Sequence, residues 1–270
     1  MWNRTAGAPT MNRMPPLKPL SKEEAIALTR GPYATTVESA ISASLAPFLW
    51  RERDEKGDPK IRNGTVFFVS ADRTFMVTAD HVFAAYLEAR NRFGDIARCQ
   101  LGNLRMDPED RLVARSARLD IATFLITPDE IDRTGDGRFA MSFNPMVPQT
   151  GKGVFFVGFP GLERRRLSER EIESGIFSAL TVADNVSVRE ISGHFNRERQ
   201  VDKPGRPTAP EGYDIGGVSG APLVTMVDSA NLCYWRLGGV MTGFSKSFEI
   251  FYATRADFIL PDGTLKTAEV

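Results

Sequence analysis

Short apolar runs separated by turn residues recur along most of this 270-residue chain. The clearest runs are residues 65–69, 74–78, 121–126 and 154–159, which are rich in Val, Phe, Thr and Ile. Beta-branched and aromatic side chains suit the pleated, half-buried surface of a sheet. Short strands at this spacing are typical of an all-β sandwich or barrel. Because the same texture lies on both sides of a polar segment near residue 140, the sequence favours two similar β units.

The charge balance restricts the possible partners. The chain has 34 basic and 34 acidic side chains, so its formal net charge is zero. A neutral chain has no bulk electrostatic attraction to nucleic acid or to an anionic membrane surface, so we expect neither as a partner. No run comes close to the roughly 18 consecutive apolar residues that a membrane helix needs.

The N-terminal segment and the cysteine count bear on the location of the protein. Residues 1–20 are interrupted by four prolines and have no apolar core, which predicts a flexible extension rather than a secretion signal. The two cysteines, Cys99 and Cys233, both lie in strand-like contexts. Two cysteines cannot form a disulfide framework in a chain of this length, so we expect buried free thiols. Together these features predict a cytoplasmic protein.

Two helices and several loops are expected besides the strands. Ser21 followed by Glu24 has the pattern of a capping box, which predicts a short helix that ends before residue 31. Apolar spacing predicts a second helix over residues 82–92. Composition predicts loops over residues 128–143 and 192–212. It also predicts a single strand over residues 186–191.

Three residues lie at positions suited to catalysis. His81 lies between a strand and a helix, Asp120 opens an apolar strand, and Ser219 lies in a turn with three nearby glycines. Alone, such a histidine or aspartate is more often satisfied by its neighbours, and such a turn is as often an ordinary connection. A glycine turn can nevertheless direct two backbone N–H groups at one point, which is what a developing oxyanion requires.

The order His, Asp, Ser and the local sequences resemble the trypsin-like serine proteases of the chymotrypsin fold. Residues 77–81 (Val-Thr-Ala-Asp-His) are similar to that family's Thr-Ala-x-His block. Residues 119–122 (Leu-Asp-Ile-Ala) are similar to its Asp-Ile-Ala block, and residues 217–222 (Gly-Val-Ser-Gly-Ala-Pro) to its Gly-x-Ser-Gly-Gly-Pro block. The three residues are 39 and 99 positions apart, and the resemblance covers residues 40–260.

The resemblance implies two six-stranded antiparallel β-barrels with the site between them. Ser219 would attack a peptide carbonyl, His81 would transfer the proton, and Asp120 would orient the imidazole. The N–H groups of Gly217 and Ser219 would form the oxyanion hole. This chemistry implies no metal and no cofactor.

Two positions depart from the pattern of the animal digestive members. Val218 replaces the aspartate that pairs with a newly cut N-terminus, so activation by such cleavage is not expected. Bacterial members of the high-temperature-requirement type also lack this aspartate, and the chain resembles them better. Ala221 replaces the second glycine of the serine block, and its methyl group would tighten the turn that forms the oxyanion hole.

The substrate pocket is predicted from the same resemblance. The residue six positions before the nucleophile lies at the base of the pocket in the digestive enzymes, and here it is Tyr213, with Asp214 beside it. The wall strand is expected near Gly238 and Gly239, whose missing side chains would leave room for a substrate. These residues favour a small or medium apolar residue before the scissile bond.

These observations predict four segments: an N-terminal extension with a short helix at residues 1–40, a first barrel at 41–140, a second barrel at 141–262 and a tail at 263–270. The predicted function is a serine endopeptidase acting on a protein or peptide. The alternative is a catalytically inactive protease fold that serves as a binding or scaffold module. A regulatory partner protein, or restraint by the extension or the 192–212 loop, is a further hypothesis.

Overall fold

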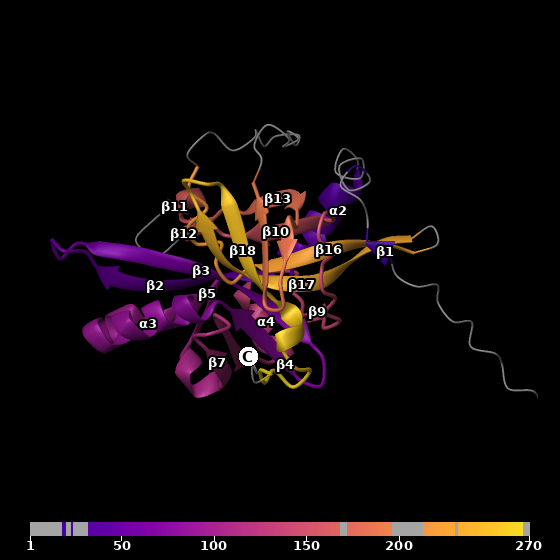
Figure 1. The fold of residues 1–270 in the computed structure, drawn as a ribbon. Coiled ribbons are helices and arrows are strands. Elements are labelled where there is room, and N and C mark those ends of the chain that lie inside the picture. The colour runs from indigo at the N-terminus through magenta and orange to yellow at the C-terminus, as the bar shows by residue number, and fades with distance from the viewer. Residues whose placement is uncertain are drawn as a thin grey trace, which may run out of the picture.

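The computed structural model describes residues 18–19, 23, 32–167, 172–195, 213–229 and 232–266. Two curled antiparallel sheets make up most of this part of the chain (Figure 1). The predicted all-β class with two barrel-like units is therefore confirmed. The helix expected before residue 31 lies outside the described residues, apart from Glu23, which is helical.

The first sheet contributes the strands that lead to two of the three candidate residues. Its strands follow the order β6-β5-β2-β3-β4-β8-β7, and β9 adds a short parallel pairing to β3. Their bounds are β2 (Leu45–Arg53), β3 (Pro59–Ser70), β4 (Thr74–Thr78), β5 (Cys99–Leu101), β6 (Leu104–Met106), β7 (Leu112–Ser116), β8 (Ile121–Leu125) and β9 (Met141–Ser142).

The candidate serine lies in the turn that precedes β16, a strand of the second sheet. Its order is β13-β10-β16-β17-β18-β15-β14, and β1 pairs with the far end of β16. Their bounds are β1 (Lys18–Pro19), β10 (Gly153–Gly158), β13 (Phe177–Val182), β14 (Asn185–Val186), β15 (Glu190–His194), β16 (Pro222–Ser229), β17 (Leu232–Ser245) and β18 (Ile250–Arg255). A separate two-stranded sheet joins β11 (Arg164–Arg166) to β12 (Ile172–Ser174).

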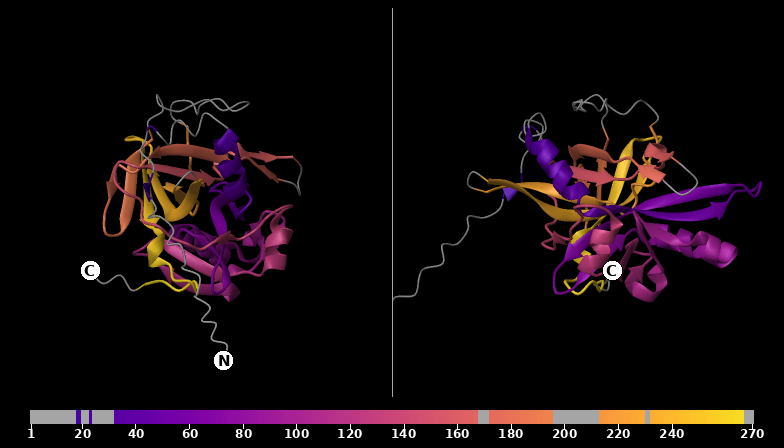
Figure 2. Two further views of the ribbon diagram at one scale, coloured as in Figure 1. Left: turned by 90° about the vertical axis from the view of Figure 1, so that its right-hand side faces the viewer. Right: turned by 180° about the vertical axis from the view of Figure 1, so that it is seen from behind.

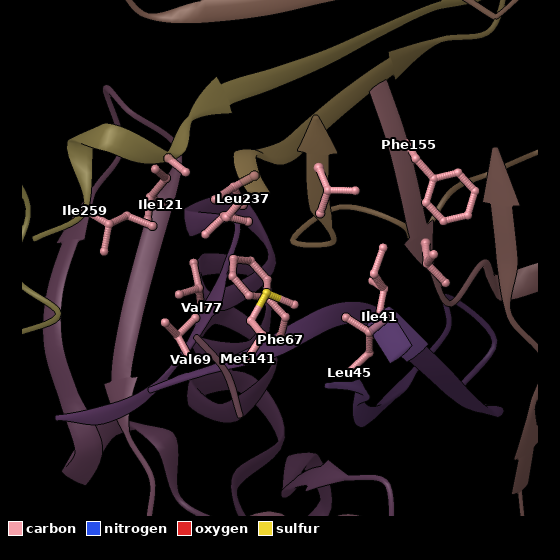
Figure 3. Close-up of a cluster of buried hydrophobic side chains, with 14 of the residues drawn as sticks. Ile41, Leu45, Phe67, Val69, Val77, Ile121, Met141, Phe155, Leu237 and Ile259 are labelled. Atoms are coloured by element: carbon pink, nitrogen blue, oxygen red, sulfur yellow. The ribbon is translucent and has the colours of Figure 1, made fainter. Parts of the chain in front are cut away.

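Within the described residues, both main sheets contain eight strands rather than six, because short segments pair at their margins. The boundaries predicted at residues 40, 140 and 262 stay predictions. One central hydrophobic cluster nevertheless includes residues of both sheets, among them Phe67 and Ile121 from the first and Phe155 and Leu237 from the second (Figure 3). Because this cluster spans both sheets, it fixes one sheet against the other.

Within the described ranges of two or more residues, three α-helices flank the sheets. The helix α3 (Asp80–Phe93) confirms the helix predicted over residues 82–92. The helix α2 (Pro32–Ser42) was not predicted, because the Gly-Pro pair at residues 31–32 looked like a stop. Proline is tolerated in the first turn of a helix, where its missing N–H has no intrahelical acceptor. Val37 and Ile41 on α2 are buried in the central cluster, so this end of the predicted extension packs against the core.

Two loop and strand predictions were wrong in part. The segment predicted as a loop over residues 128–143 begins with the helix α4 (Pro128–Thr134), which Thr127 and Glu130 cap reciprocally. The single strand predicted over residues 186–191 is a hairpin, since β14 ends at Val186 and β15 begins at Glu190. Of the two expected buried thiols, Cys99 is free and buried, whereas the side chain of Cys233 lies outside the described set.

None of the helices in the described ranges is long and apolar enough to cross a membrane.

A buried hydrogen bond connects the second sheet to the residue before Asp120. The hydroxyl of Thr254 on β18 donates to the carbonyl oxygen of Leu119 at 2.6 Å. Thr254→Val keeps the shape but leaves this carbonyl without its donor, so we expect a loss of about 1–3 kcal/mol in the free energy of unfolding. Urea denaturation monitored by circular dichroism measures it.

Thr181→Val is the matched control for this experiment. Its hydroxyl donates to the His194 carbonyl at 2.7 Å, but at the exposed surface, where water can replace it. We expect a change within about 0.5 kcal/mol there. Equal losses in the two variants would mean that the buried connection contributes no more than a surface bond.

Candidate active site

His81 is held by Asp120 through two contacts. The residue lies in the first turn of α3, directly after β4. One carboxylate oxygen of Asp120 accepts the backbone N–H of His81 at 2.8 Å, and the other lies 2.7 Å from Nδ1. Since an ionised carboxylate only accepts hydrogen bonds, Nδ1 carries the hydrogen and Nε2 is left as the basic nitrogen. The two contacts fix the backbone, the ring plane and the tautomer together.

Asp120 reaches this position through a left-handed backbone conformation. Its φ is +53°, in the turn that precedes β8. Aspartate tolerates this region better than most residues, because its short side chain can bond locally. Its side chain is 27% exposed and that of His81 is 49% exposed, so the pair is accessible from one side.

A buried ion pair anchors the start of α3, and sequence reasoning missed it. Asp80 is buried, and its two oxygens accept the Arg115 guanidinium at 2.7 and 3.0 Å. The hydrogen bond to Asp80 also raises the pKa of Arg115 above its ordinary value. The only sequence signal was an acidic residue next to the histidine, and nothing local pointed to a partner on β7.

The turn around Ser219 uses two glycines in left-handed conformations. Gly217 has φ +104° and Gly220 has φ +89°. A Cβ at Gly220 would lie 2.1 Å from the carbonyl oxygen of Thr65, and one at Gly217 would lie 2.3 Å from Nδ2 of Asn63. The turn therefore requires glycine at both positions, for conformation and for close approach.

Two backbone N–H groups of this turn have no acceptor within the described part of the chain. They belong to Gly217 and Ser219, the pair expected to form the oxyanion hole. The other N–H groups of the turn donate inside the protein, those of Gly216, Val218, Gly220 and Ala221. Ala221 is buried, and its N–H closes the turn onto Val218. The turn thus leaves two donors free on alternate residues, with the serine side chain between them.

Strand β3 connects this turn to the first sheet through Thr65. The Thr65 N–H donates to the carbonyl oxygen of Ser219 at 2.9 Å, and its hydroxyl donates to that of Gly217 at 2.9 Å. The same hydroxyl accepts the N–H of Phe159 at 3.0 Å. Thr78, at the end of β4, donates to the Thr65 carbonyl at 2.7 Å. Thr65 is therefore hydrogen-bonded both to the strand that leads to His81 and to the turn that carries Ser219.

Ser219 and His81 line the same two cavities. The first, here the β17 cavity, has a volume of about 260 Å³ and lies between residues 214–219 and residues 241–246. The second, here the α3 groove, has a volume of about 480 Å³ and lies between the β2–β3 hairpin and α3. Among the described residues, no hydrogen bond joins the Ser219 hydroxyl to the His81 ring.

The residues predicted for the substrate pocket are only partly brought together. Asp214 lines the β17 cavity, and its Oδ1 accepts the Gly216 N–H at 2.8 Å. Gly238 and Gly239 do not line it, because a Cβ on them would meet Leu223 or Thr254 inside the sheet. The lining of β17 comes instead from Met241, Thr242, Gly243 and Phe244.

Tyr213 also lies away from the cavity. Its hydroxyl donates to Glu163, and its ring stacks on Phe177 at a centroid distance of 5.3 Å. Burial raises the pKa of Tyr213 above its ordinary value, and the hydrogen bond to Glu163 adds to the shift. This tyrosine therefore belongs to the packing of the second sheet.

Other groupings of chemical residues are less complete. His194 ends β15 and contacts Asp184 at 2.9 Å, but its side chain is 67% exposed, and neither residue lines the β17 cavity or the α3 groove. The part of the chain that the structure describes contains no group of three or more His, Cys, Asp or Glu residues able to hold a metal ion.

Comparison with protein-family models finds no match, and comparison with curated proteins finds none either. Solved structures that are similar in fold include the following three. A Glu endopeptidase in complex with MPD has 12% identity, covers 79% of this chain and 85% of its own, and gives a TM-score of 0.45. The serine protease domain of the Sesbania mosaic virus polyprotein has 15% identity, coverages of 83% and 94%, and a TM-score of 0.44. Catalytically inactive tobacco etch virus protease complexed with substrate has 12% identity, coverages of 80% and 79%, and a TM-score of 0.44.

The close approach of Gly220 to β3 can be tested with a pair of glycine variants. In Gly220→Ala, the added methyl group would lie 2.1 Å from the Thr65 oxygen, so the turn must move. Gly57 has a similar φ of +84° with no atom near its missing Cβ, so Gly57→Ala measures the left-handed strain alone. We expect a loss of roughly 1–2 kcal/mol for Gly57→Ala and clearly more for Gly220→Ala. Urea denaturation of both variants measures the difference, and equal losses would contradict the contact.

Proposed function

We propose that this protein is a serine endopeptidase with His81, Asp120 and Ser219 as its catalytic triad. The single observation that carries the proposal is the alternation of N–H groups in the glycine turn. Only Gly217 and Ser219 leave their donors free in residues 216–221 of the structure, next to a serine that shares two cavities with a carboxylate-bound histidine. A turn with a purely structural role has no need for two unpaired donors beside a hydroxyl.

The reaction would proceed through an acyl-enzyme. The Ser219 oxygen forms a bond to the carbonyl carbon of the peptide while Nε2 of His81 takes the hydroxyl proton. The N–H groups of Gly217 and Ser219 stabilise the resulting oxyanion, at about 3–4 kcal/mol per donor. The C–N bond then breaks as His81 returns the proton to the leaving amine. Water then attacks the acyl-enzyme while His81 takes its proton, and the bond between Ser219 and the acyl carbon breaks as the proton returns to Ser219 and the acid is released. Asp120 holds the imidazole throughout.

The substrate would bind as an extended strand beside residues 242–244, with the side chain before the scissile bond in the β17 cavity. Ile215, Val218 and Met241 give this cavity an apolar interior. We therefore propose an apolar residue of medium size at this position. Burial of Val218 in the second sheet also supports a protease that does not depend on an ion pair with a new N-terminus.

An inactive protease fold used as a binding module is the second candidate. The observation in its favour is the absence of a hydrogen bond between Ser219 and His81 in the described structure. The bacterial high-temperature-requirement type and the cytoplasmic location stay predictions from the sequence.

A fluorophosphonate probe separates the two candidates, because it reacts with an activated serine and needs no knowledge of the substrate. We expect stoichiometric labelling of the wild type and its loss in Ser219→Ala and His81→Ala. His194→Ala is the matched control, since it also removes a histidine with an aspartate partner, and it should label normally. A folded wild-type protein that does not label would favour the binding module.

Asp120→Asn tests the tautomer argument. The amide would donate to Nδ1, so the ring hydrogen would move to Nε2 and the base would be lost. We expect the labelling rate to fall by about 10⁴-fold, as for the same exchange in other triads. Circular dichroism checks folding, and a rate within tenfold of the wild type would contradict the role of Asp120.

A further inference from the structure

The α3 groove extends the candidate site well beyond the reacting residues. It lies between the β2–β3 hairpin and α3, and His81, Gly217 and Ser219 line its inner end. The hairpin and the helix project from the body side by side in Figure 1, and the opposite view in Figure 2 shows the same arrangement. A chain that leaves the site in this direction would run between them.

The chemistry of the proposed reaction indicates which part of a substrate would occupy the α3 groove. The residue before the scissile bond belongs in the β17 cavity, on the far side of Ser219. His81, which would give its proton to the leaving amine, opens the helix that forms one wall of the α3 groove. Resting on the proposed function, we propose that the α3 groove binds the residues after the scissile bond, and that Arg92 and Arg53 at its outer end select an acidic residue there.

The length of the groove fixes the position of that residue. One face of α3 lines it from His81 to Arg92. At 1.5 Å per residue, these two positions are about 16 Å apart along the helix axis. An extended peptide rises about 3.3 Å per residue, so this distance corresponds to roughly five residues. The acidic residue is therefore expected about five positions after the scissile bond.

The groove changes in character from its inner to its outer end. In the first turns of α3 the exposed Ala85 lines it and offers apolar surface to the first residues of the leaving segment, whereas Val82 and Trp50 line it as almost fully buried side chains. Glu88 lines the middle, about two helical turns from His81, so an acidic residue is disfavoured there.

The outer end is basic. In the described chain Arg92 is exposed and has no carboxylate at ion-pair distance, and its guanidinium lies 5.1 Å from the ring centre of Phe93. Arg53 donates one N–H to the Gly57 carbonyl at 2.8 Å and pairs with no carboxylate among the described residues. Arg62, by contrast, is paired with Glu52 at 2.6 Å. Two guanidinium groups are therefore available to an incoming carboxylate.

Cleavage of a proteome-derived peptide library, read by mass spectrometry, tests the inference without a known substrate. We expect Asp and Glu to be enriched about 3- to 10-fold at the fourth to sixth positions after the cleaved bond, the range that two exposed ion pairs supply. Arg92→Glu together with Arg53→Glu should reverse this preference towards Lys and Arg. Glu88→Lys should add a preference for acidic residues near the third position.

Arg133→Glu is the matched control, because Arg133 also lies exposed in the last turn of a helix but outside both cavities. It should leave the profile unchanged. Fluorophosphonate labelling of each variant checks that its serine still reacts, because the probe binds at Ser219, at the inner end of the groove, and does not extend to Arg53 or Arg92. Cleavage without enrichment of Asp and Glu after the cleaved bond would overturn this inference alone. So would a residue preference that the double variant does not alter. No cleavage and no labelling would overturn the proposed function, and this inference with it.

Discussion

The relation between the two sheets at the site depends on Thr65. Its N–H and hydroxyl donate to the carbonyls of Ser219 and Gly217 in the glycine turn. Its carbonyl accepts the Thr78 hydroxyl at the end of β4, and its hydroxyl accepts the N–H of Phe159, directly after β10. Most of these bonds are buried or half-buried, where an unmade bond costs more than at the surface. The strand that leads to His81 therefore cannot shift against the serine turn without breaking several bonds at once.

A second set of contacts places the imidazole within that frame. Asp80 fixes the first turn of α3 to β7, Asp120 holds the ring, and Thr254 of the second sheet holds the carbonyl before Asp120. The three partners come from different elements, so the position of His81 is determined from several directions. The proton transfer proposed for His81 would require such support, because the ring must keep its orientation.

Local pattern was sufficient for the elements that lead to the site. The strands at residues 74–78 and 121–125 and the helix after His81 follow from side-chain type and spacing, and the serine turn follows from its glycines. Contacts between distant residues could not be predicted in this way. Thr65 and Gly217 are 152 positions apart, and nothing near either residue indicates the other. For the same reason, local pattern could not show that residues 241–244, rather than Gly238 and Gly239, line the cavity beside Ser219.

The described chain has a second histidine–aspartate pair, and comparing the two pairs shows what makes one of them a candidate site. Asp184 meets the backbone N–H and Nδ1 of His194 with a single oxygen, on a ring that is mostly exposed. Asp120 divides the same two contacts between its two oxygens, on a ring that faces the serine turn across two cavities. The local chemistry of the pairs is nearly the same, so the pair alone does not define a site. The difference is the turn with two free donors, which β3 holds beside one histidine and not beside the other.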